Sequence, residues 1–301
     1  MKDFGYSKPL YVMAFDHRAS FVKKLFGWEG ELTSEQTQKV SEFKHVIYEG
    51  LLKAIEQGAS KEASAILADE QFGTKVHEDA KAKGITTILT IEKSGQDEFD
   101  FEYGEQFGEH ILKFQPTFTK ALIRYNPEGD KELNVRQGER LKKAWEFCHI
   151  NNIKFLIEPL VPATKEQLES VGGDQKRYDV EVRPGLVVRM IKELQDFGVE
   201  VDVWKIEGLN KPEDYEAVVK QARADGRDNV GVVVLGRGEG KEGVERWLKA
   251  GKIVPGVTGF AIGRTIFWEP LTALKDEKIS REEAVMAICE NYMYFYNIFN
   301  S

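Results

Sequence analysis

The chain has 301 residues, of which 42% are hydrophobic and 31% charged, and its formal net charge is −8. This composition is typical of a folded protein with a sizeable core, and the acidic balance argues against a binding surface for nucleic acid or an anionic membrane. No apolar run is long enough to span a membrane, and residues 1–10 lack the pattern of a signal peptide. Cys148 and Cys289 lie far apart in sequence, which fits a reducing compartment, so we expect a cytoplasmic protein.

Short apolar runs alternate with longer amphipathic segments along the chain. The apolar runs predict eight strands, at residues 10–16, 65–70, 86–92, 119–125, 154–158, 201–207, 230–235 and 259–263. Helical patterns fall between most of them, and residues 95–116 are the hardest to assign. Strand–helix alternation indicates a parallel sheet, and eight units predict an α/β fold, a (β/α)8 TIM barrel forming a single domain over residues 1–301. A doubly wound open sheet is the alternative, but no glycine-rich turn follows the first strand.

Four helices have clear boundaries in the sequence. The clearest covers residues 34–57, because Thr33 and Gln36 form a capping box ahead of regularly spaced apolar residues. The others are predicted at residues 183–197, which contain Pro184 near the start; from Pro212 to before Gly226; and from Ser280, which forms a second capping box with Glu283 and opens a C-terminal helix.

Charged side chains gather at the predicted carboxyl ends of the strands, where barrel enzymes carry their catalytic residues. Structural strands do not need so many charges at one end, so the pattern predicts a polar site. The residues are Asp16, His17 and Arg18; Asp69, Glu70 and Gln71; Glu92 and Lys93; Lys120 and Arg124; Glu158; Lys205 and Glu207; Arg237; and Arg264.

Lys205 lies within the buried strand predicted at residues 201–207. Strand alternation places Val203, Lys205 and Glu207 on one face. A buried ammonium is costly unless it is paired or used chemically, and a lysine with a lowered pKa is nucleophilic enough to form a Schiff base. A structural salt bridge is the alternative, and this stretch alone does not decide between them.

Two glycine–arginine turns follow the last two predicted strands. Gly236, Arg237 and Gly238 follow strand seven, and Gly263 and Arg264 follow strand eight. Glycine-rich turns free backbone N–H groups to bind an anion, arginine adds matching charge, and these two loops are the usual phosphate site of barrels. The two turns together predict a phosphate-binding site.

The sequence gives little support for a metal or a redox cofactor. Only His17 of the five histidines follows a predicted strand, and no His-x-His or His-x-x-x-His pair occurs. We therefore predict no metal and no cofactor. A magnesium site made only of carboxylates, from Asp16, Asp69 and Glu70, stays open. A glycosidase with paired carboxylates is a further alternative, but it has no need for a buried lysine.

Several stretches of the chain resemble a known family. Residues 15–18, 68–73, 92–95, 155–158 and 201–207 are similar to the class I aldolases related to tagatose-bisphosphate aldolase. Residues 202–209, 234–238 and 259–268 resemble more narrowly the 5-dehydro-2-deoxyphosphogluconate aldolase domain of myo-inositol catabolism. That domain often follows a sugar kinase, and we expect this chain to be a stand-alone form.

The resemblance implies a TIM barrel that cleaves a phosphorylated keto-sugar through a Schiff base, giving dihydroxyacetone phosphate and malonate semialdehyde. The turn at residues 236–238 replaces a serine-bearing turn of the tagatose-type relatives, and residues 124–127 also depart from their pattern. Both departures favour the inositol-type substrate. The implied roles are Lys205 as the Schiff-base lysine, Glu158 as proton carrier, Lys120 as its helper and Asp16 as an orienting acid; Arg237 and Arg264 with Gly236, Gly238 and Gly263 as phosphate ligands; and His17, Asp69 and Gln71 as substrate contacts.

Other interpretations remain at this point. Asp16 and Asp69 are also typical of loop caps, and Glu158 of a structural partner for a lysine. Repulsion from Lys120 is expected to keep the amine of Lys205 neutral. A transaldolase or another lyase on the same lysine, a metal-dependent barrel enzyme and a phosphosugar-binding barrel without catalysis stay open, as does a homo-oligomer.

Overall fold

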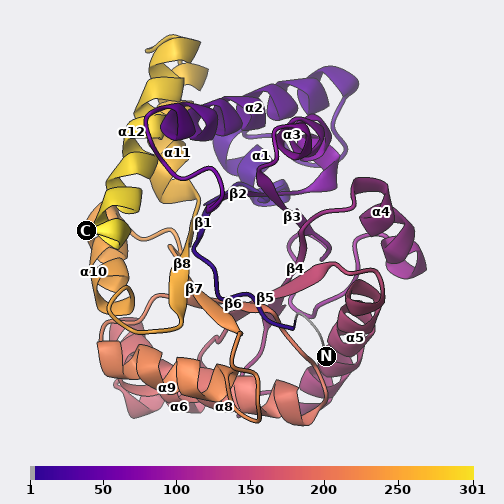
Figure 1. The fold of residues 1–301 in the computed structure, drawn as a ribbon, viewed down its shortest axis with the longest axis vertical. Coiled ribbons are helices and arrows are strands. Elements are labelled where there is room, and N and C mark those ends of the chain that lie inside the picture. Colours follow the sequence, from indigo (N-terminus) through magenta and orange to yellow (C-terminus); the bar gives the residue numbers. More distant parts are fainter. Residues whose placement is uncertain (1–3) are drawn as a thin grey trace.

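Eight parallel strands close into a barrel in the order β1 to β8, with β1 hydrogen-bonded to β8 (Figure 1). The protein is described by a computed structural model that covers residues 4–301. The predicted (β/α)8 barrel is confirmed, and the open sheet is not formed. The strands are β1 (Leu10–Ala14), β2 (Ser64–Ala68), β3 (Thr86–Thr90), β4 (Phe118–Arg124), β5 (Lys154–Leu160), β6 (Val203–Glu207), β7 (Gly231–Leu235) and β8 (Val257–Ile262).

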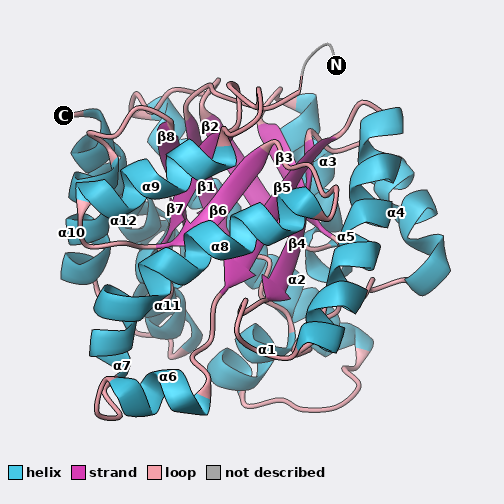
Figure 2. Cartoon of the chain, turned by 90° about the horizontal axis from the view of Figure 1, so that it is seen from below, coloured by secondary structure: helices cyan, strands magenta, loops and turns pink. Residues whose placement is uncertain are grey.

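Helices surround the barrel on its outside (Figure 1). Seen from the side, α1, α6 and α7 lie at one end of the barrel, and the C-terminus lies at the other (Figure 2). The helices are α1 (Ala19–Phe26), α2 (Ser34–Glu56), α3 (Glu70–Ala82), α4 (Phe107–Phe114), α5 (Lys131–Ile150), α6 (Lys165–Ser170), α7 (Gln175–Arg177), α8 (Arg183–Asp196), α9 (Pro212–Ala222), α10 (Lys241–Gly251), α11 (Arg264–Lys275) and α12 (Arg281–Asn300), with short 3-10 and π-helical turns η1 (Gly104–Gln106) and η2 (Tyr178–Val182).

The predicted helix boundaries agree with the structure at the two capping boxes. Thr33 and Gln36 cap α2, and Ser280 and Glu283 cap the C-terminal helix α12. Two regions differ. The segment at residues 95–116 contains η1 and α4, and α8 does not begin afresh at Arg183 because η2 leads into it without a break. The strands predicted at 10–16, 65–70 and 86–92 also extend two residues too far, since β1 ends at Ala14, β2 at Ala68 and β3 at Thr90. The strand predicted at 201–207 begins two residues later, at Val203.

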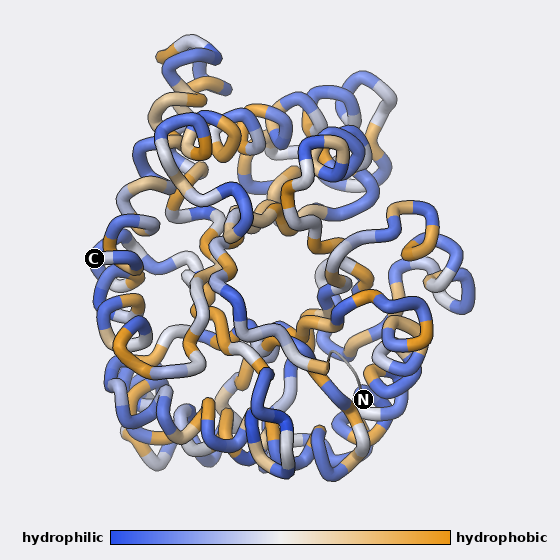
Figure 3. The backbone as a smooth tube through the Cα atoms, in the orientation of Figure 1, coloured by the Kyte–Doolittle hydropathy of each residue, from blue (hydrophilic) through white to orange (hydrophobic). Residues whose placement is uncertain are grey.

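Two apolar layers hold the barrel together. One lies between the strands and the helices, where hydrophobic and hydrophilic residues alternate along helices that bury one face (Figure 3). The other fills the inside of the barrel. Its buried members are Leu10, Val12, Ala14, Ala65, Leu67, Ile88, Phe118, Leu156, Val203, Val233 and Ala261.

The inner apolar layer fixes which side chains point inward at the next level of the barrel. Because strand side chains alternate with a period of two, the inward position after Phe118 is Lys120. By the same spacing, Glu158 follows Leu156 and Lys205 follows Val203. Each charged residue therefore sits on an apolar plug, two residues closer to the carboxyl end of its strand.

The C-terminal helix α12 packs against α2, and Figure 1 shows the yellow α12 beside the dark purple α2. Their backbones approach closely at Gly50, where a Cβ atom would lie 2.3 Å from Cγ2 of Ile288. Within residues 4–301, none of the helices is both long enough and apolar enough to cross a membrane. The two cysteines are free thiols, and both are buried.

Candidate active site

A cavity of about 340 Å³ opens at the carboxyl ends of the strands. It brings together most residues that the sequence predicted for the site, although they come from six strands or the loops that follow them. Those that line it are Asp16, His17, Lys120, Glu158, Lys205, Gly236, Arg237, Gly238, Gly263 and Arg264. Asp69 and Gln71 are not among the lining residues.

A network of ion pairs forms the floor of the cavity. Lys120 Nζ lies 2.6 Å from Asp16 Oδ2, 2.7 Å from Glu92 Oε1 and 3.0 Å from Glu158 Oε2. Lys205 Nζ lies 2.8 Å from that same Oε2 of Glu158. One carboxylate oxygen of Glu158 therefore joins the two lysines, and all five side chains are nearly buried.

Charge pairing decides the ionisation of this network. Burial opposes the charge of Asp16, but Lys120 and Lys205 hold its pKa well below the ordinary value. Burial likewise opposes ionisation of Glu158, and the same two lysines lower its pKa. Burial alone would lower the pKa of Lys120, yet its carboxylate partners, first Asp16, raise that pKa well above the ordinary value. Lys120 is therefore a permanent cation, and Asp16 and Glu158 are carboxylates at neutral pH.

His17 lies beside this network as a neutral imidazole. Burial lowers its pKa to about 4, and the nearby charges of Arg264 and Lys205 act in the same direction against the attraction of Asp16. Its Nδ1 atom is buried and has no hydrogen-bond partner. Since a neutral imidazole can donate or accept one hydrogen bond, this atom is available to a bound ligand.

Arg264 presents an uncompensated cation at the mouth. Within residues 4–301 no carboxylate pairs with its guanidinium, which lies against Gly238: a Cβ atom there would be 2.6 Å from Nη2. Gly238 also has φ of 74°, which favours glycine. Gly263 is required for another reason, because a Cβ atom on it would meet the carbonyl oxygen of Ala14 at 2.2 Å. Arg264 opens α11, and the N-terminus of a helix attracts anions.

Arg237 differs from Arg264 in having two carboxylate partners. Its Nη1 lies 2.7 Å from Asp179 Oδ2, and its Nε lies 2.8 Å from Glu207 Oε1. The charge of this predicted phosphate ligand is thus already neutralised by protein carboxylates. Of the two arginines predicted to bind phosphate, Arg237 is paired with carboxylates, whereas Arg264 has no carboxylate partner within residues 4–301.

Asp69 and Gln71 are placed away from the predicted substrate site. Asp69 pairs with the fully buried Lys44 and accepts a hydrogen bond from the N–H of Phe72, 2.9 Å away, as the N-cap of α3. The loop-cap interpretation is therefore confirmed for Asp69. Gln71 is exposed on α3.

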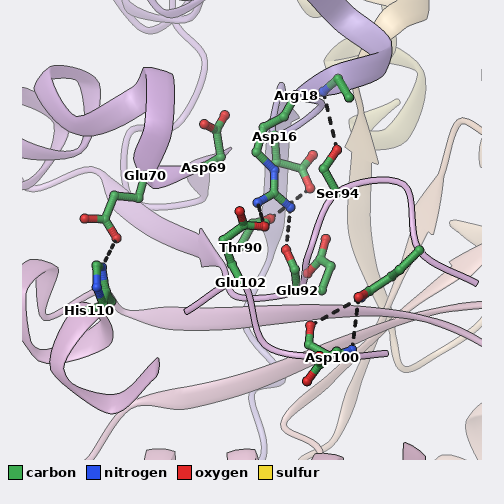
Figure 4. Close-up of polar contacts among 12 residues, drawn as sticks. Asp16, Arg18, Asp69, Glu70, Thr90, Glu92, Ser94, Asp100, Glu102 and His110 are labelled. Atoms are coloured by element: carbon green, nitrogen blue, oxygen red, sulfur yellow. Dashed lines mark hydrogen bonds and ion pairs between the residues drawn. The ribbon is translucent and has the colours of Figure 1, made fainter. Parts of the chain in front are cut away.

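The carboxylate-only metal site finds no support. Glu70 points to His110, 2.7 Å away, rather than toward Asp16 (Figure 4), and it also pairs with Lys113. Asp16 is engaged by Lys120, and its Oδ2 also accepts a hydrogen bond of 2.9 Å from Thr90. No group of three metal-ligating side chains forms among the residues that the structure describes.

Glu92 lines the cavity as one of the predicted strand-end charges, but the sequence assigned it no role in the site. It pairs with Lys120 and accepts the N–H of Leu122 at 3.2 Å. Its position at the end of the third predicted strand was a usable signal, but nothing in the sequence separated it from other rim charges. The loop after β3 is fixed nearby by Arg18, which bonds to Glu102 at 2.6 Å and to the carbonyl oxygen of Glu92 (Figure 4).

Comparisons with curated proteins find relatives among aldolases. The chain is 26% identical over 200 residues to proteins named tagatose 1,6-diphosphate aldolase from Listeria monocytogenes and Listeria innocua. The matched part covers 65% of this chain and 54% of each relative, so the chain spans about half the length of the curated relatives it matches. The expected likeness to tagatose-bisphosphate aldolases is confirmed at this level.

Solved structures share the fold at low identity. Cgl0159 from Corynebacterium glutamicum superposes with a TM-score of 0.55 at 16% identity, covering 98% of this chain and 88% of that one. A fructose-bisphosphate aldolase from Slackia heliotrinireducens gives 0.55 at 11% identity, covering 93% and 85%. Over residues 5–301 the sequence matches a family described as an uncharacterized protein conserved in bacteria (DUF2090), and the chain belongs to that family.

Proposed function

We propose that this protein is a class I aldolase that cleaves a phosphorylated keto-sugar through a Schiff base on Lys205. The observation that carries the proposal is the contact of 2.8 Å between Lys205 Nζ and Glu158 Oε2 on the floor of a cavity. An amine and a carboxylate at this distance can exchange a proton, which imine formation requires. The names of the curated relatives support the same activity.

Imine formation needs a neutral amine. Glu158 takes a proton from Lys205 across their contact, and the free amine attacks the ketone carbon of the substrate. The carbinolamine then loses water as Glu158 returns that proton to the departing hydroxyl group. The products of this first half of the reaction are a protonated imine and the carboxylate of Glu158.

Cleavage uses the protonated imine as an electron sink. Glu158 removes the proton of the hydroxyl group on the carbon two positions from the imine carbon. The bond between that carbon and the carbon next to the imine breaks, and its electron pair forms an enamine. The aldehyde leaves. Glu158 then protonates the enamine carbon, and water releases the ketone product from Lys205. Lys120 keeps Glu158 ionised between steps, and Asp16 and Glu92 hold Lys120 in place.

The phosphate belongs to the ketone half of the substrate. Arg264 offers a free guanidinium near Lys205, so it is the expected ligand of a phosphate one carbon from the imine, with Arg237 beside it. The turns at Gly236, Gly238 and Gly263 line the cavity beside these two arginines. This arrangement releases dihydroxyacetone phosphate as the ketone product.

Among substrates, we favour 2-deoxy-5-keto-D-gluconate 6-phosphate, which would also give malonate semialdehyde. The resemblance of residues 202–209, 234–238 and 259–268 to the aldolase domain of myo-inositol catabolism supports this choice. Tagatose 1,6-bisphosphate is the competing substrate, because curated relatives are named for it.

A substrate panel tests the proposal. The purified protein is incubated with the keto-gluconate phosphate, tagatose 1,6-bisphosphate or fructose 1,6-bisphosphate, and release of dihydroxyacetone phosphate is measured with and without EDTA. We expect cleavage of the keto-gluconate phosphate that survives EDTA and is lost in Lys205→Ala. Activity that needs added zinc or magnesium would instead indicate a metal-stabilised enolate, and cleavage retained in Lys205→Ala would refute the imine.

A further inference from the structure

A second guanidinium faces the cavity from the wall opposite the phosphate turn. Arg124 is the last residue of β4 and lines the cavity together with Lys120 and Leu122 of the same strand face. It lies four positions after Lys120 in the strand, which places it about 13 Å further along, at the mouth. Its Nη1 donates to the carbonyl oxygen of Gln96, which fixes the side chain without neutralising it.

The charge of Arg124 is poorly compensated. Its one acidic neighbour among the described residues is Asp97, whose carboxylate lies 3.9 Å from Nε and is 96% exposed, so water screens that pair. The other cations on this side of the mouth are occupied. Lys93 pairs with Asp100 at 2.6 Å, and Arg18 pairs with Glu102 at 2.6 Å.

The barrel sets Arg124 across the mouth from Arg264. In a closed ring of eight strands, β4 and β8 lie four strands apart, which is the opposite position. Glu158 on β5 and Lys205 on β6 come from the arc between them. A ligand that bridges Arg124 and Arg264 therefore passes over the amine of Lys205.

We propose that Arg124 binds a second anionic group, carried by the half of the substrate that leaves as the aldehyde. This assignment rests on the proposed function, in which Arg264 holds the phosphate of the ketone half. A terminal carboxylate and a second phosphate share the chemistry that a guanidinium recognises, two oxygen acceptors matched to its fork. Arg124 is thus the specificity residue that selects substrates with an anion at each end.

The test runs the reaction in the condensation direction, with dihydroxyacetone phosphate and two matched pairs of aldehydes. Glyceraldehyde 3-phosphate is compared with glyceraldehyde, and malonate semialdehyde with 3-hydroxypropanal. For Arg124→Gln we expect kcat/KM to fall about 10- to 100-fold for the anionic member of the preferred pair and less than about twofold for its neutral partner. The anionic aldehyde for which kcat/KM falls further shows whether Arg124 binds a carboxylate or a phosphate.

Two controls make the result specific. Arg124→Lys keeps the positive charge but lacks the paired planar N–H donors of a guanidinium. Its kcat/KM for the anionic aldehyde should fall between those of the wild type and Arg124→Gln. Lys93→Gln removes the same charge from the same rim, but from a lysine that is already paired, and should cost little. Equal losses for neutral and anionic aldehydes, no loss, or the same selective loss in Lys93→Gln would overturn the role of Arg124.

Borohydride trapping of dihydroxyacetone phosphate separates this inference from the function on which it rests. The trapped ketone lacks the aldehyde half, so Arg124→Gln should be labelled at Lys205 as fully as the wild type. If the variant is trapped but shows no selective loss, only the role of Arg124 fails. If the wild type is not trapped, the proposed function fails and the assignment of Arg124 fails with it.

Discussion

Two lysines on the floor of the cavity share one oxygen atom of Glu158, and three carboxylates surround Lys120. Besides its contact with Glu158, Lys120 pairs with Asp16 and Glu92. Lys120 also lowers the pKa of Glu158, which keeps a carboxylate beside the amine of Lys205. The proposed nucleophile, Lys205, and its proposed proton acceptor, Glu158, are thereby set at contact distance.

At the mouth, the two predicted phosphate arginines should differ when each is removed. Arg264→Ala deletes an unpaired guanidinium, and we expect KM to rise about tenfold or more for the phosphorylated substrate, with an unphosphorylated analogue little affected. Arg237→Ala removes a guanidinium that Asp179 and Glu207 already neutralise, so its effect on KM should be smaller. Steady-state kinetics of both variants check this. Equal losses on both substrates would show that Arg264 is structural.

His17 predicts a pH dependence of stability. Its pKa is about 4 in the folded protein and 6.5 in its unperturbed state, so the unfolded chain binds the proton more tightly. The stability contributed by the neutral imidazole is complete above pH 6.5 and is lost as the pH falls from 6.5 toward 4. At pH 5 this loss amounts to roughly 2 kcal/mol. Urea unfolding at pH 7.5 and pH 5 measures it, and His17→Gln should show a loss smaller by about that amount. An identical pH dependence in both proteins would contradict it.

At the scale of whole elements, sequence patterns predicted the strands and helix starts that depend on neighbouring residues. The eight strands follow from runs of apolar residues, and the capping boxes at Thr33 and Ser280 begin their helices as expected. Residues 95–116 could not be assigned because α4 has only eight residues and is preceded by loop structure that tertiary contacts hold. The loop carries Gln96, whose backbone is held by Arg124 of β4.

Candidate site residues were predictable from their positions at strand ends, but their partners were not. The sequence placed Lys205 and Glu158 at neighbouring strand ends, and the structure joins them. It gave no sign that Asp179, 58 residues before Arg237, would neutralise that arginine. Asp69 also met the pattern of a strand-end acid and instead pairs with Lys44 from α2. Pairings of this kind depend on which helix covers which strand, and no local pattern encodes that.

The contact between α2 and α12 is tight enough to test with one methyl group. Gly50→Ala places a Cβ atom 2.3 Å from Ile288 Cγ2, so the helices must separate, and we expect a loss of about 1–3 kcal/mol. The matched control is Gly185→Ala in α8, where a Cβ atom has nothing within 4 Å. There alanine should stabilise the helix by up to about 1 kcal/mol. Urea titrations of both variants give the difference, and a Gly50→Ala protein as stable as the wild type would contradict this packing.

For the molecule as a whole, barrel closure brings the site together. Asp16 and Lys120 are 104 residues apart in sequence and 2.6 Å apart in space. Buried apolar side chains fill the barrel interior below them, and the charged layer above lines the cavity. The same closure sets Arg124 and Arg264 on opposite walls, with the amine of Lys205 on the arc between them. Residues at strand ends that are far apart in sequence form one site because β8 pairs with β1 and closes the barrel.

Borohydride trapping tests the central claim most directly. The protein is reduced in the presence of dihydroxyacetone phosphate, and the labelled peptide is identified by mass spectrometry. The account predicts one label, on Lys205, absent in Lys205→Ala and in Lys205→Arg, because a guanidinium keeps its proton and cannot form the imine. Lys120→Met should still be labelled at Lys205. A label on Lys120, or an active enzyme that takes no label at all, would contradict a Schiff base on Lys205.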